Sequence, residues 1–179
     1  MKIIEVKRKA NPIPLKLTNG DMYDSVVDVL DYTNSTFDNM GRRIYRCGFI
    51  NSDHTVNYSG GMLEEGNYYF IIGKHRDKYK APLLFNSSAE FFEKIKNYSE
   101  LNSKVRTMPS LSPNPNHGGK KIITYVNFHR GGLNWDWSHG CMTMVYAKGL
   151  EHYWNDFMKL FRMSEKGIFR LVNKNSAVM

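Results

Sequence analysis

Runs of β-branched and aromatic residues in the first half of the chain are the feature that most limits its possible folds. Residues 2–8 ("KIIEVKR") and 42–50 ("RRIYRCGFI") carry such residues at the spacing of strands. Residues 68–72 follow a cluster of turn-forming residues and indicate another strand. Residues 23–33 fit either a helix or a strand, because their apolar spacing does not separate the two. We therefore expect the first 85 residues to be rich in β-structure.

The second half of the chain contains two segments with helical periodicity. Ser87 and Glu90 resemble a capping box, and the apolar residues after them predict a helix over residues 88–103. A second helix is expected within residues 150–162, because its apolar residues recur every three or four positions. One face of this second helix carries Leu150, Tyr153, Trp154, Phe157, Leu160 and Phe161.

The other segments of this half favour loops and strands. Residues 108–119 contain three prolines and two glycines and are expected to form a loop, whereas residues 121–129 and 167–173 have the composition of strands. The whole pattern predicts an α+β fold, mainly a β-sheet or sandwich with two packed helices. A length of 179 residues fits a single domain spanning residues 1–179 that can bury a core without disulfide bonds.

The charge of the chain suggests what kind of partner it meets. A formal net charge of +8 favours anionic partners such as nucleic acid, acidic membrane surfaces or wall polymers. The basic residues are scattered, and no zinc-finger or RNA-recognition signature is present, so a nucleic-acid partner is not expected. Residues 1–17 lack the apolar core of a signal peptide, and no apolar run has the length of a membrane span.

The two cysteines, Cys47 and Cys141, are too few for a disulfide framework and have different surroundings. Cys47 lies in a strand-like run and is expected to be a small buried apolar residue. Cys141 lies in residues 127–144, "NFHRGGLNWDWSHGCMTM", which combine it with two histidines, two tryptophans and several glycines. This segment is the strongest candidate for chemistry in the chain.

A thiol active site is the first interpretation of this segment. Cysteine is a good nucleophile only as the thiolate, and an imidazole can supply that state. His129 stands twelve residues before Cys141, and His139 stands two residues before it. Gly140 lets the backbone bend beside the sulfur and leaves consecutive N–H groups that could bind an oxyanion. Nucleophile, base and backbone donors are the parts that acyl transfer requires.

Two other interpretations remain open from these residues alone. His129, His139 and Cys141, with Asp136 or His117, could bind zinc, although a His-Gly-Cys triplet is not a usual ligand spacing. The sequence has no HExxH or CxxC motif, so no metal or other cofactor is expected. The segment could also be a glycine-rich turn with buried histidines and an inert thiol.

The string Ser138-His139-Gly140-Cys141, followed by the apolar Met142, resembles the signature of the L,D-transpeptidase catalytic domain family. In that signature a histidine at the end of a strand precedes a variable loop and then Ser-His-Gly-Cys, and His129 matches the upstream histidine. The resemblance covers about residues 60–162, but only its part around residues 129–144 is specific.

The sequence also departs from the family pattern at several positions. The loop between His129 and Cys141 is shorter than is usual in the family. Arg130 stands where the family often has Gly or Ser, and Thr143 stands where it often has Arg or Asn. These differences indicate a divergent member, either carried by a phage or secreted as an effector.

The family acts on peptidoglycan stem peptides, and the resemblance therefore implies a mechanism. Cys141 would attack the carbonyl of the third stem residue and expel the terminal D-alanine, with His129 as general base oriented by a backbone carbonyl. Backbone N–H groups of His139, Gly140 and Cys141 would form the oxyanion hole, with Ser138 as a supporting hydrogen-bonding residue. The thioester would then react with an amine, giving a cross-link, or with water, giving L,D-carboxypeptidase activity.

Further residues of the segment are expected to contact the substrate. Arg130 could bind a stem-peptide carboxylate, and Trp135 and Trp137 could form a wall of the groove, with Thr143 among the contacts. The simpler alternatives are an exposed charge for Arg130 and core positions for the tryptophans. The other histidines, His54, His75, His117 and His152, have no partner pattern and are expected to be structural or on the surface.

The implied substrate places the action of the protein in the periplasm or cell wall. Delivery would then require phage lysis, a secretion machine or a signal that has been removed. Two alternative functions remain: a thiol amidohydrolase with a substrate outside the wall, and a non-enzymatic wall-binding or virion-structural module.

Overall fold

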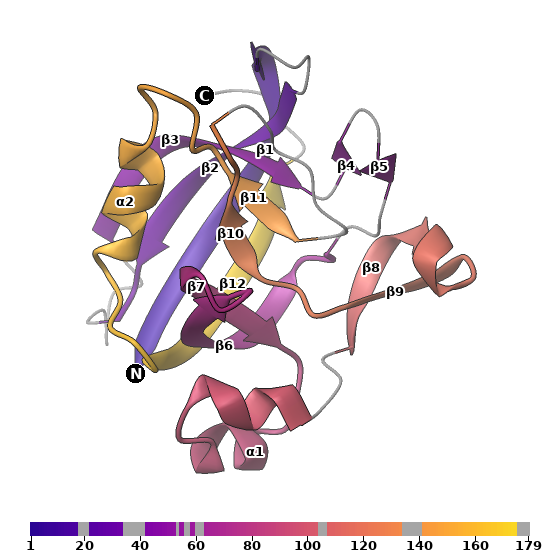
Figure 1. Ribbon diagram of the computed structural model, residues 1–179, viewed down its shortest axis with the longest axis vertical. Coiled ribbons are helices and arrows are strands. Elements are labelled where there is room, and N and C mark those ends of the chain that lie inside the picture. Colours follow the sequence, from indigo (N-terminus) through magenta and orange to yellow (C-terminus); the bar gives the residue numbers. More distant parts are fainter. Residues whose placement is uncertain are drawn as a thin grey trace.

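A mixed β-sheet of eight described strands forms the body of the molecule (Figure 1). The computed structural model describes residues 1–17, 22–33, 42–52, 54–55, 58–59, 63–103, 107–133 and 141–174. The sheet consists of β10 (Phe128–Arg130), β11 (Met142–Met144), β3 (Arg42–Ser52), β2 (Met22–Asp31), β1 (Lys2–Lys16), β12 (Lys166–Lys174), β6 (Gly66–His75) and β7 (Tyr79–Phe85), in that spatial order.

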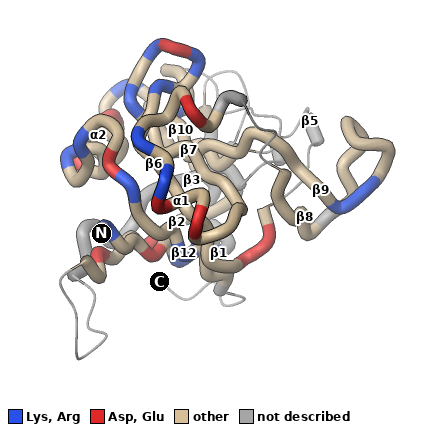
Figure 2. Tube along the Cα trace, turned by 90° about the horizontal axis from the view of Figure 1, so that it is seen from below, with Lys and Arg blue, Asp and Glu red and all other residues tan. Residues whose placement is uncertain are grey.

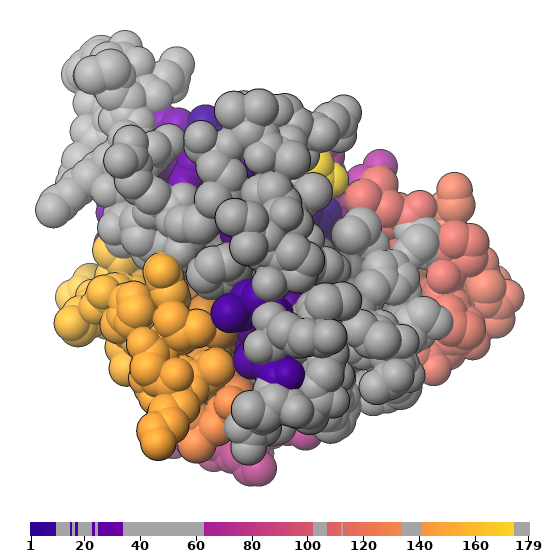
Figure 3. All heavy atoms as spheres, turned by 90° about the horizontal axis from the view of Figure 1, so that it is seen from above, coloured from indigo at the N-terminus to yellow at the C-terminus, as the bar shows by residue number. Residues whose placement is uncertain are grey.

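Smaller elements surround this sheet. Two short hairpins pair β4 (His54–Thr55) with β5 (Tyr58–Ser59), and β8 (Thr107–Asn114) with β9 (Lys120–Thr124). The helical segments are α1 (Ala89–Lys94), η1 (Tyr98–Ser103), η2 (Pro115–His117) and α2 (His152–Met158). Seen from above, the orange residues that include α2 and the salmon residues of the β8–β9 hairpin lie on opposite sides of the molecule (Figure 3).

The pairing of β1 on both sides places it inside the sheet. β1 pairs in parallel with β12 on one side and antiparallel with β2 on the other. Gly167 of β12 allows the closest approach, because a Cβ atom there would lie 2.2 Å from the carbonyl oxygen of Lys2. Ile4 and Val6 of β1 have no exposed surface. The two halves of the chain are therefore joined at the centre of the sheet.

Aromatic side chains fix α2 and β10 to each other. The ring of Phe128 lies 5.2 Å from that of Phe157 and 5.8 Å from that of Phe169, between ring centroids. Phe70 meets Phe161 edge-on at 5.6 Å. Such pairs contribute about 0.5–1.5 kcal/mol each beyond the burial of their area. Phe128 is fully buried, so the residues next to it in β10 are held firmly in place.

The sheet curls until its two edge strands meet. Leu83 of β7 forms an antiparallel bridge with Asn127, the residue just before β10, and the Leu84 N–H donates to the Val126 carbonyl at 3.0 Å. β7 and β10 lie at opposite ends of the strand order, so this contact, which we call the seam, joins the first and last strands. Residues far apart in sequence come together beside the seam.

Most strands expected from the sequence are confirmed. Residues 2–8, 42–50 and 68–72 lie in β1, β3 and β6, and the closing strand expected at residues 167–173 lies in β12. The ambiguous segment 23–33 is mostly strand β2. The α+β class with a predominance of strands is confirmed as well.

The helix expected over residues 88–103 is wrong in its extent. α1 ends after Lys94, where Ile95 takes an extended conformation with ψ of 129°, and η1 follows as a separate 3₁₀ helix. Its N-cap is Ser88 rather than Ser87, since the Ser88 hydroxyl accepts from the Phe91 N–H at 3.2 Å. The helix is divided here because Tyr98, the first residue of η1, packs against the sheet.

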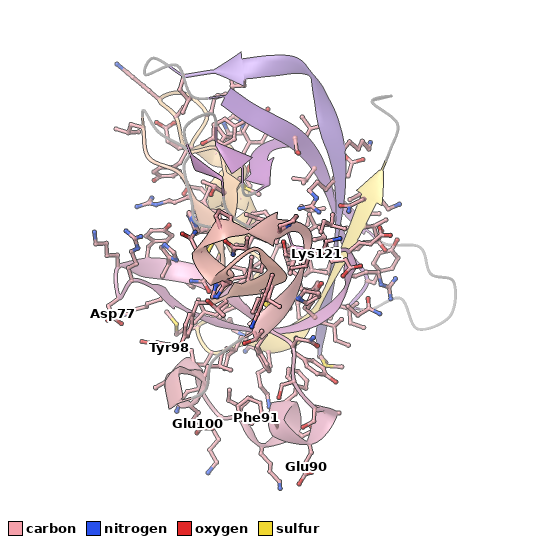
Figure 4. All side chains as sticks on the ribbon, turned by 90° about the vertical axis from the view of Figure 1, so that its right-hand side faces the viewer. Asp77, Glu90, Phe91, Tyr98, Glu100 and Lys121 are labelled. Atoms are coloured by element: carbon pink, nitrogen blue, oxygen red, sulfur yellow. The ribbon has the colours of Figure 1, made fainter. Side chains whose placement is uncertain are left out.

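Tyr98 explains why the chain must turn between α1 and η1. Figure 4 shows Glu90 and Phe91 on α1 and Glu100 on η1 at one end of the molecule, with Tyr98 closer to the strands. A Cβ atom on Gly73 of β6 would lie 2.6 Å from Cγ of Tyr98, so the tyrosine fills the space that this glycine leaves.

Two further predictions are corrected by the structure. Residues 108–119, expected to be a loop, form most of β8 and all of η2, and Pro109 is paired with Ile122. Proline is tolerated there because β8 belongs to a two-stranded hairpin rather than to the main sheet. The strand expected over residues 121–129 is divided into β9 and β10 at Tyr125, whose φ is 56°.

The helix expected within residues 150–162 is confirmed but short. α2 covers residues 152–158, and its apolar face is buried as the spacing predicts, with Trp154, Phe157 and Phe161 each at most 4% exposed. No helix of the described part of the chain is long and apolar enough to cross a membrane.

Candidate active site

A cavity of about 880 Å³ opens beside the seam. Its walls come from the turn between β6 and β7, from the residues just before β10, from β10 itself and from the start of β11. Cys141, His129 and Arg130 all line it. The structure therefore brings three of the residues expected from the sequence to one cavity.

The pairing of β10 with β11 sets the relation between His129 and Cys141. The two strands run parallel, with His129 opposite Thr143. Asn127 and Cys141 each stand one residue before these strands, so Cys141 lies two residues before Thr143 and on the same face. Diagonal neighbours of this kind are about 7 to 8 Å apart, a distance that an imidazole can span.

Cys141 is a partly exposed cysteine whose sulfur contacts the backbone between β9 and β10. The Asn127 N–H donates to its sulfur at 3.4 Å, and the thiol donates to the Tyr125 carbonyl at 3.7 Å. Tyr125 has a left-handed φ of 56°, and its side chain is 49% exposed on the cavity. A left-handed backbone costs a non-glycine residue about 1–2 kcal/mol, and such strain clusters at functional sites.

His129 is buried, with 4% of its surface exposed, and its tautomer follows from its contacts. Its Nδ1 lies 2.8 Å from the carbonyl oxygen of Arg130. A carbonyl only accepts, so Nδ1 carries the proton and donates it. The lone pair is therefore on Nε2, where the Thr143 hydroxyl lies 3.4 Å away. Nε2 is the atom of this ring that can take a proton from a nucleophile.

The pKa of His129 is lowered from 6.5 to about 4. Burial is the largest cause, because it penalises the charged imidazolium. The hydrogen bond to the Arg130 carbonyl opposes this effect, and the charge of Arg76 adds to it. His129 is consequently neutral at neutral pH and has its basic nitrogen available.

No hydrogen bond joins His129 to Cys141 among the contacts of the described residues. The thiol contacts the Tyr125 carbonyl, and Nε2 of His129 is next to Thr143. Hydrogen bonds between catalytic groups are often long in enzymes without substrate and shorten when it binds. The geometry therefore places His129 and Cys141 in one cavity.

His75 is a residue of the site that the sequence did not reveal. Its ring stacks on that of His129 with 4.3 Å between centroids, and the Asn127 side-chain N–H donates to its Nδ1 at 3.0 Å. Asn127 thus contacts His75 through its side chain and Cys141 through its backbone. His75 was expected to be structural or on the surface, and the structure places it in the lining of the cavity.

The turn between β6 and β7 adds positive charge to the mouth of the cavity. Arg76 and Asp77 have left-handed φ angles of 50° and 57°, and the Lys78 N–H donates to the His75 carbonyl at 3.0 Å. Paired left-handed residues are characteristic of tight hairpin turns. Asp77, which is labelled in Figure 4, lies at the tip of the β6–β7 hairpin. Figure 2 shows Lys and Arg residues in blue along this hairpin. Arg76 and Lys78 both line the cavity.

Arg130 is held between two aromatic rings. Its guanidinium carbon lies 4.4 Å from the ring centre of Tyr79 and 4.0 Å from that of Tyr146. The Tyr79 hydroxyl donates to the Arg130 carbonyl at 3.2 Å. Burial raises the pKa of Tyr79 to about 12, and the charge of Arg130 opposes this rise. Tyr79 therefore remains neutral beside the arginine.

The structure does not support the substrate contact expected for Thr143. Its side chain has no exposed surface, so a substrate in the cavity cannot reach it. Its hydroxyl faces Nε2 of His129 instead. Thr143 is better described as a residue that holds the imidazole.

Five residues expected at the site lie outside the described residues: Trp135, Trp137, Ser138, His139 and Gly140. The oxyanion hole and the aromatic wall of the groove therefore stay predictions. The side chain of Cys47 also lies outside the description, although the residue itself belongs to β3. Within the described part of the chain, no group of three or more His, Cys, Asp or Glu residues is arranged to hold a metal ion.

Comparisons with models of protein families, with curated proteins and with solved structures found no match for this chain. Its function has to be argued from the residues of the cavity.

Proposed function

We propose that this protein is a cysteine-dependent acyltransferase or peptidase that acts on peptidoglycan stem peptides and has a fold of the L,D-transpeptidase type. The observation that carries the proposal is the state of His129. Its Nδ1–H is bound to the Arg130 carbonyl, which leaves Nε2 as the basic atom, and His129 lines the same cavity as Cys141. The resemblance of residues 138–142 to the transpeptidase signature supports the choice of substrate.

The first half of the proposed reaction forms a thioester. Cys141 attacks the carbonyl of the third stem residue as its proton passes to Nε2 of His129, and a carbon–sulfur bond forms. The imidazolium is stabilised by its Nδ1–H bond to the Arg130 carbonyl. When the carbon–nitrogen bond breaks, His129 returns the proton to the amine of the departing D-alanine.

The second half of the proposed reaction releases the acyl group. An amine of another stem, or water, attacks the thioester carbonyl while His129 accepts its proton, and the thiolate of Cys141 leaves and is reprotonated. Attack by an amine gives a cross-link, and attack by water gives a shortened stem. Because His129 is neutral at rest, the proton moves during the reaction rather than before it.

The charges around the cavity agree with an anionic substrate. Arg76, Lys78 and Arg130 line it, and Glu151 is its one acidic residue among the described lining residues. Stem peptides carry several carboxylates, so this excess of positive charge would favour their approach. The proposed substrate places the reaction in the periplasm or cell wall.

The test is a digestion of purified disaccharide-tetrapeptide muropeptides, with the products identified by mass spectrometry. Loss of D-alanine with a linked dimer would identify a transpeptidase, and tripeptide alone would identify a carboxypeptidase. Cys141→Ala should abolish both products, and His152→Gln, which alters an exposed histidine of α2, should keep them. Unchanged muropeptides with the wild-type protein would contradict the proposal.

Two further measurements separate the alternatives. Cleavage of other peptides by wild type but not by Cys141→Ala would indicate a thiol amidohydrolase with a substrate outside the wall. Equal binding of wild type and Cys141→Ala to isolated wall, with activity in neither, would indicate a binding module.

A further inference from the structure

The guanidinium of Arg130 is arranged like a receptor for an anion. The rings of Tyr79 and Tyr146 both pack against this group, with their centres 4.4 and 4.0 Å from its central carbon. Cation–π contacts of this kind hold an arginine in place. A guanidinium has five N–H donors, more than its side-chain hydrogen bond with Tyr79 uses. A group that is already held loses little freedom when it binds a ligand.

The described residues provide no carboxylate for this arginine. The ion pairs among them involve other basic residues, and none includes Arg130. Glu151 lines the same cavity, but its Oε2 accepts from the Gly149 N–H at 3.0 Å. Tyr79, with its pKa raised to about 12, does not neutralise Arg130 as a phenolate. Among the described residues, the guanidinium of Arg130 therefore lines the cavity without a direct ion pair to a carboxylate.

The position of Arg130 in the chain relates it to one part of the substrate. Arg130 follows His129 directly, and its own carbonyl holds the imidazole ring. In the proposed reaction His129 delivers a proton to the amine of the leaving residue. The α-carboxylate of that residue is attached to the carbon next to this amine. The guanidinium of Arg130 reaches the same cavity as His129 and is connected to its imidazole through two rings. It packs on Tyr79, whose ring lies 5.5 Å from that of His75, and His75 stacks on His129. The carboxylate would therefore lie in the part of the cavity that Arg130 lines.

We infer that Arg130, clamped between Tyr79 and Tyr146, binds the free α-carboxylate of the residue that leaves the acyl donor. This inference rests on the proposed function. Binding of this carboxylate by Arg130 makes the protein selective for the terminal peptide bond of a stem with a free carboxyl end. Internal peptide bonds and stems with an amidated end react more slowly. Arg76 and Lys78 at the cavity mouth strengthen the attraction but do not set its position.

Two alkylating probes test the inference without any assumption about turnover. Bromoacetyl-D-alanine and bromoacetyl-D-alaninamide carry the same reactive carbon, and each alkylates the Cys141 sulfur with loss of bromide. They differ only in the carboxylate, which lies where the leaving residue would place it. Rate constants for labelling of Cys141 are measured by mass spectrometry of its peptide, with iodoacetamide as the reference for thiol reactivity.

We expect the carboxylate probe to label the wild-type protein about tenfold faster or more than the amide probe, the factor that one charge-assisted hydrogen bond supplies. Arg130→Gln should bring the ratio close to one. The iodoacetamide rate of the same variant is the reference that corrects the two probe rates for any change in the reactivity of the thiol. Arg130→Lys should retain part of the preference, because it keeps the charge but loses the planar fork. The matched control Arg162→Gln, which removes an exposed arginine outside the cavity lining, should keep the full ratio.

The outcomes separate the inference from the proposed function. Equal rates for both probes in the wild type, or an unchanged ratio in Arg130→Gln, would overturn the inference while normal iodoacetamide labelling leaves the thiol chemistry standing. A Cys141 that iodoacetamide does not label would overturn the proposed function and the inference with it. The wild-type comparison of the two probes needs no variant, so equal rates would overturn the inference even if Arg130→Gln does not fold; a wild-type preference is then assigned to Arg130 by its partial loss in Arg130→Lys.

Discussion

Acid should destabilise this protein through His129 in a way that can be measured. The folded protein holds this imidazole buried and neutral, with a pKa lowered to about 4, whereas the unfolded chain titrates near the ordinary value of 6.5. As the pH falls from 6.5 to 4, His129 binds a proton in the unfolded state but remains largely neutral in the folded state. The free energy of unfolding must therefore fall over that window and change no further from this cause below it.

The size of the effect follows from the two pKa values. Above pH 7 both states are neutral, and His129 contributes almost no pH dependence. The loss reaches about 1.4 kcal/mol at pH 5.5 and about 3 kcal/mol at pH 4, because each pKa unit corresponds to 1.36 kcal/mol. A loss of about 3 kcal/mol is a large part of the 5–15 kcal/mol that typical domains possess.

The assay is urea unfolding of wild type and His129→Gln at pH 7, 5.5 and 4, followed by fluorescence. Glutamine keeps a donor for the Arg130 carbonyl but does not titrate, so the variant has a lower stability that lacks this pH dependence. The difference between the two proteins should shrink by about 3 kcal/mol from pH 7 to pH 4. His152→Gln, at an exposed position, is the control that should follow wild type. Parallel loss of stability in wild type and His129→Gln would refute the reasoning.

Two further predictions concern the thiol and the packing of the sheet. Labelling of Cys141 by iodoacetamide at pH 6 should fall about tenfold or more in His129→Gln, because the base that accepts the thiol proton is gone; equal rates would remove His129 from that role. Gly167→Ala should destabilise the protein more than Gly73→Ala in urea unfolding, since the new methyl of the first meets a backbone carbonyl at 2.2 Å and that of the second meets side chains at 2.6 Å. Both should cost about 1–3 kcal/mol or more, and the reverse order would contradict the assigned contacts.

Three strands and one helix could be predicted from the sequence because their signal is local. Alternating β-branched residues identified β1, β3 and β6, and apolar periodicity identified α2. The helix over residues 88–103 was overextended, because its apolar spacing continues past the point where Tyr98 must turn into the space above Gly73. The β8–β9 hairpin was missed because prolines, which normally exclude strands, are tolerated at residues 108–119 on an edge.

The candidate site could be predicted only where its parts lie close in sequence. Cys141 and His129 belong to one short crossover between parallel strands, so a motif search finds them together. His75 stands 52 residues before Asn127, its partner. No periodicity in the sequence indicates such a contact, because it exists only where the curled sheet brings β7 to β10. Asn127 could have been noticed, since it precedes His129 by two residues and therefore shares its face.

Closure of the seam and assembly of the site are one structural event. The parallel pairing of β10 with β11 sets His129 opposite Thr143 and brings Cys141 beside Asn127. The bridge from Leu83 to Asn127 then joins this pair of strands to the β6–β7 hairpin, which delivers His75 to the face of the imidazole. The same hairpin brings the tyrosine that holds the guanidinium in the cavity wall. The positions of Cys141, His129 and Arg130 thus depend on a contact between the two ends of the sheet. The left-handed backbone of Tyr125, beside the thiol, lies just before this contact, where the surrounding structure can hold a strained conformation.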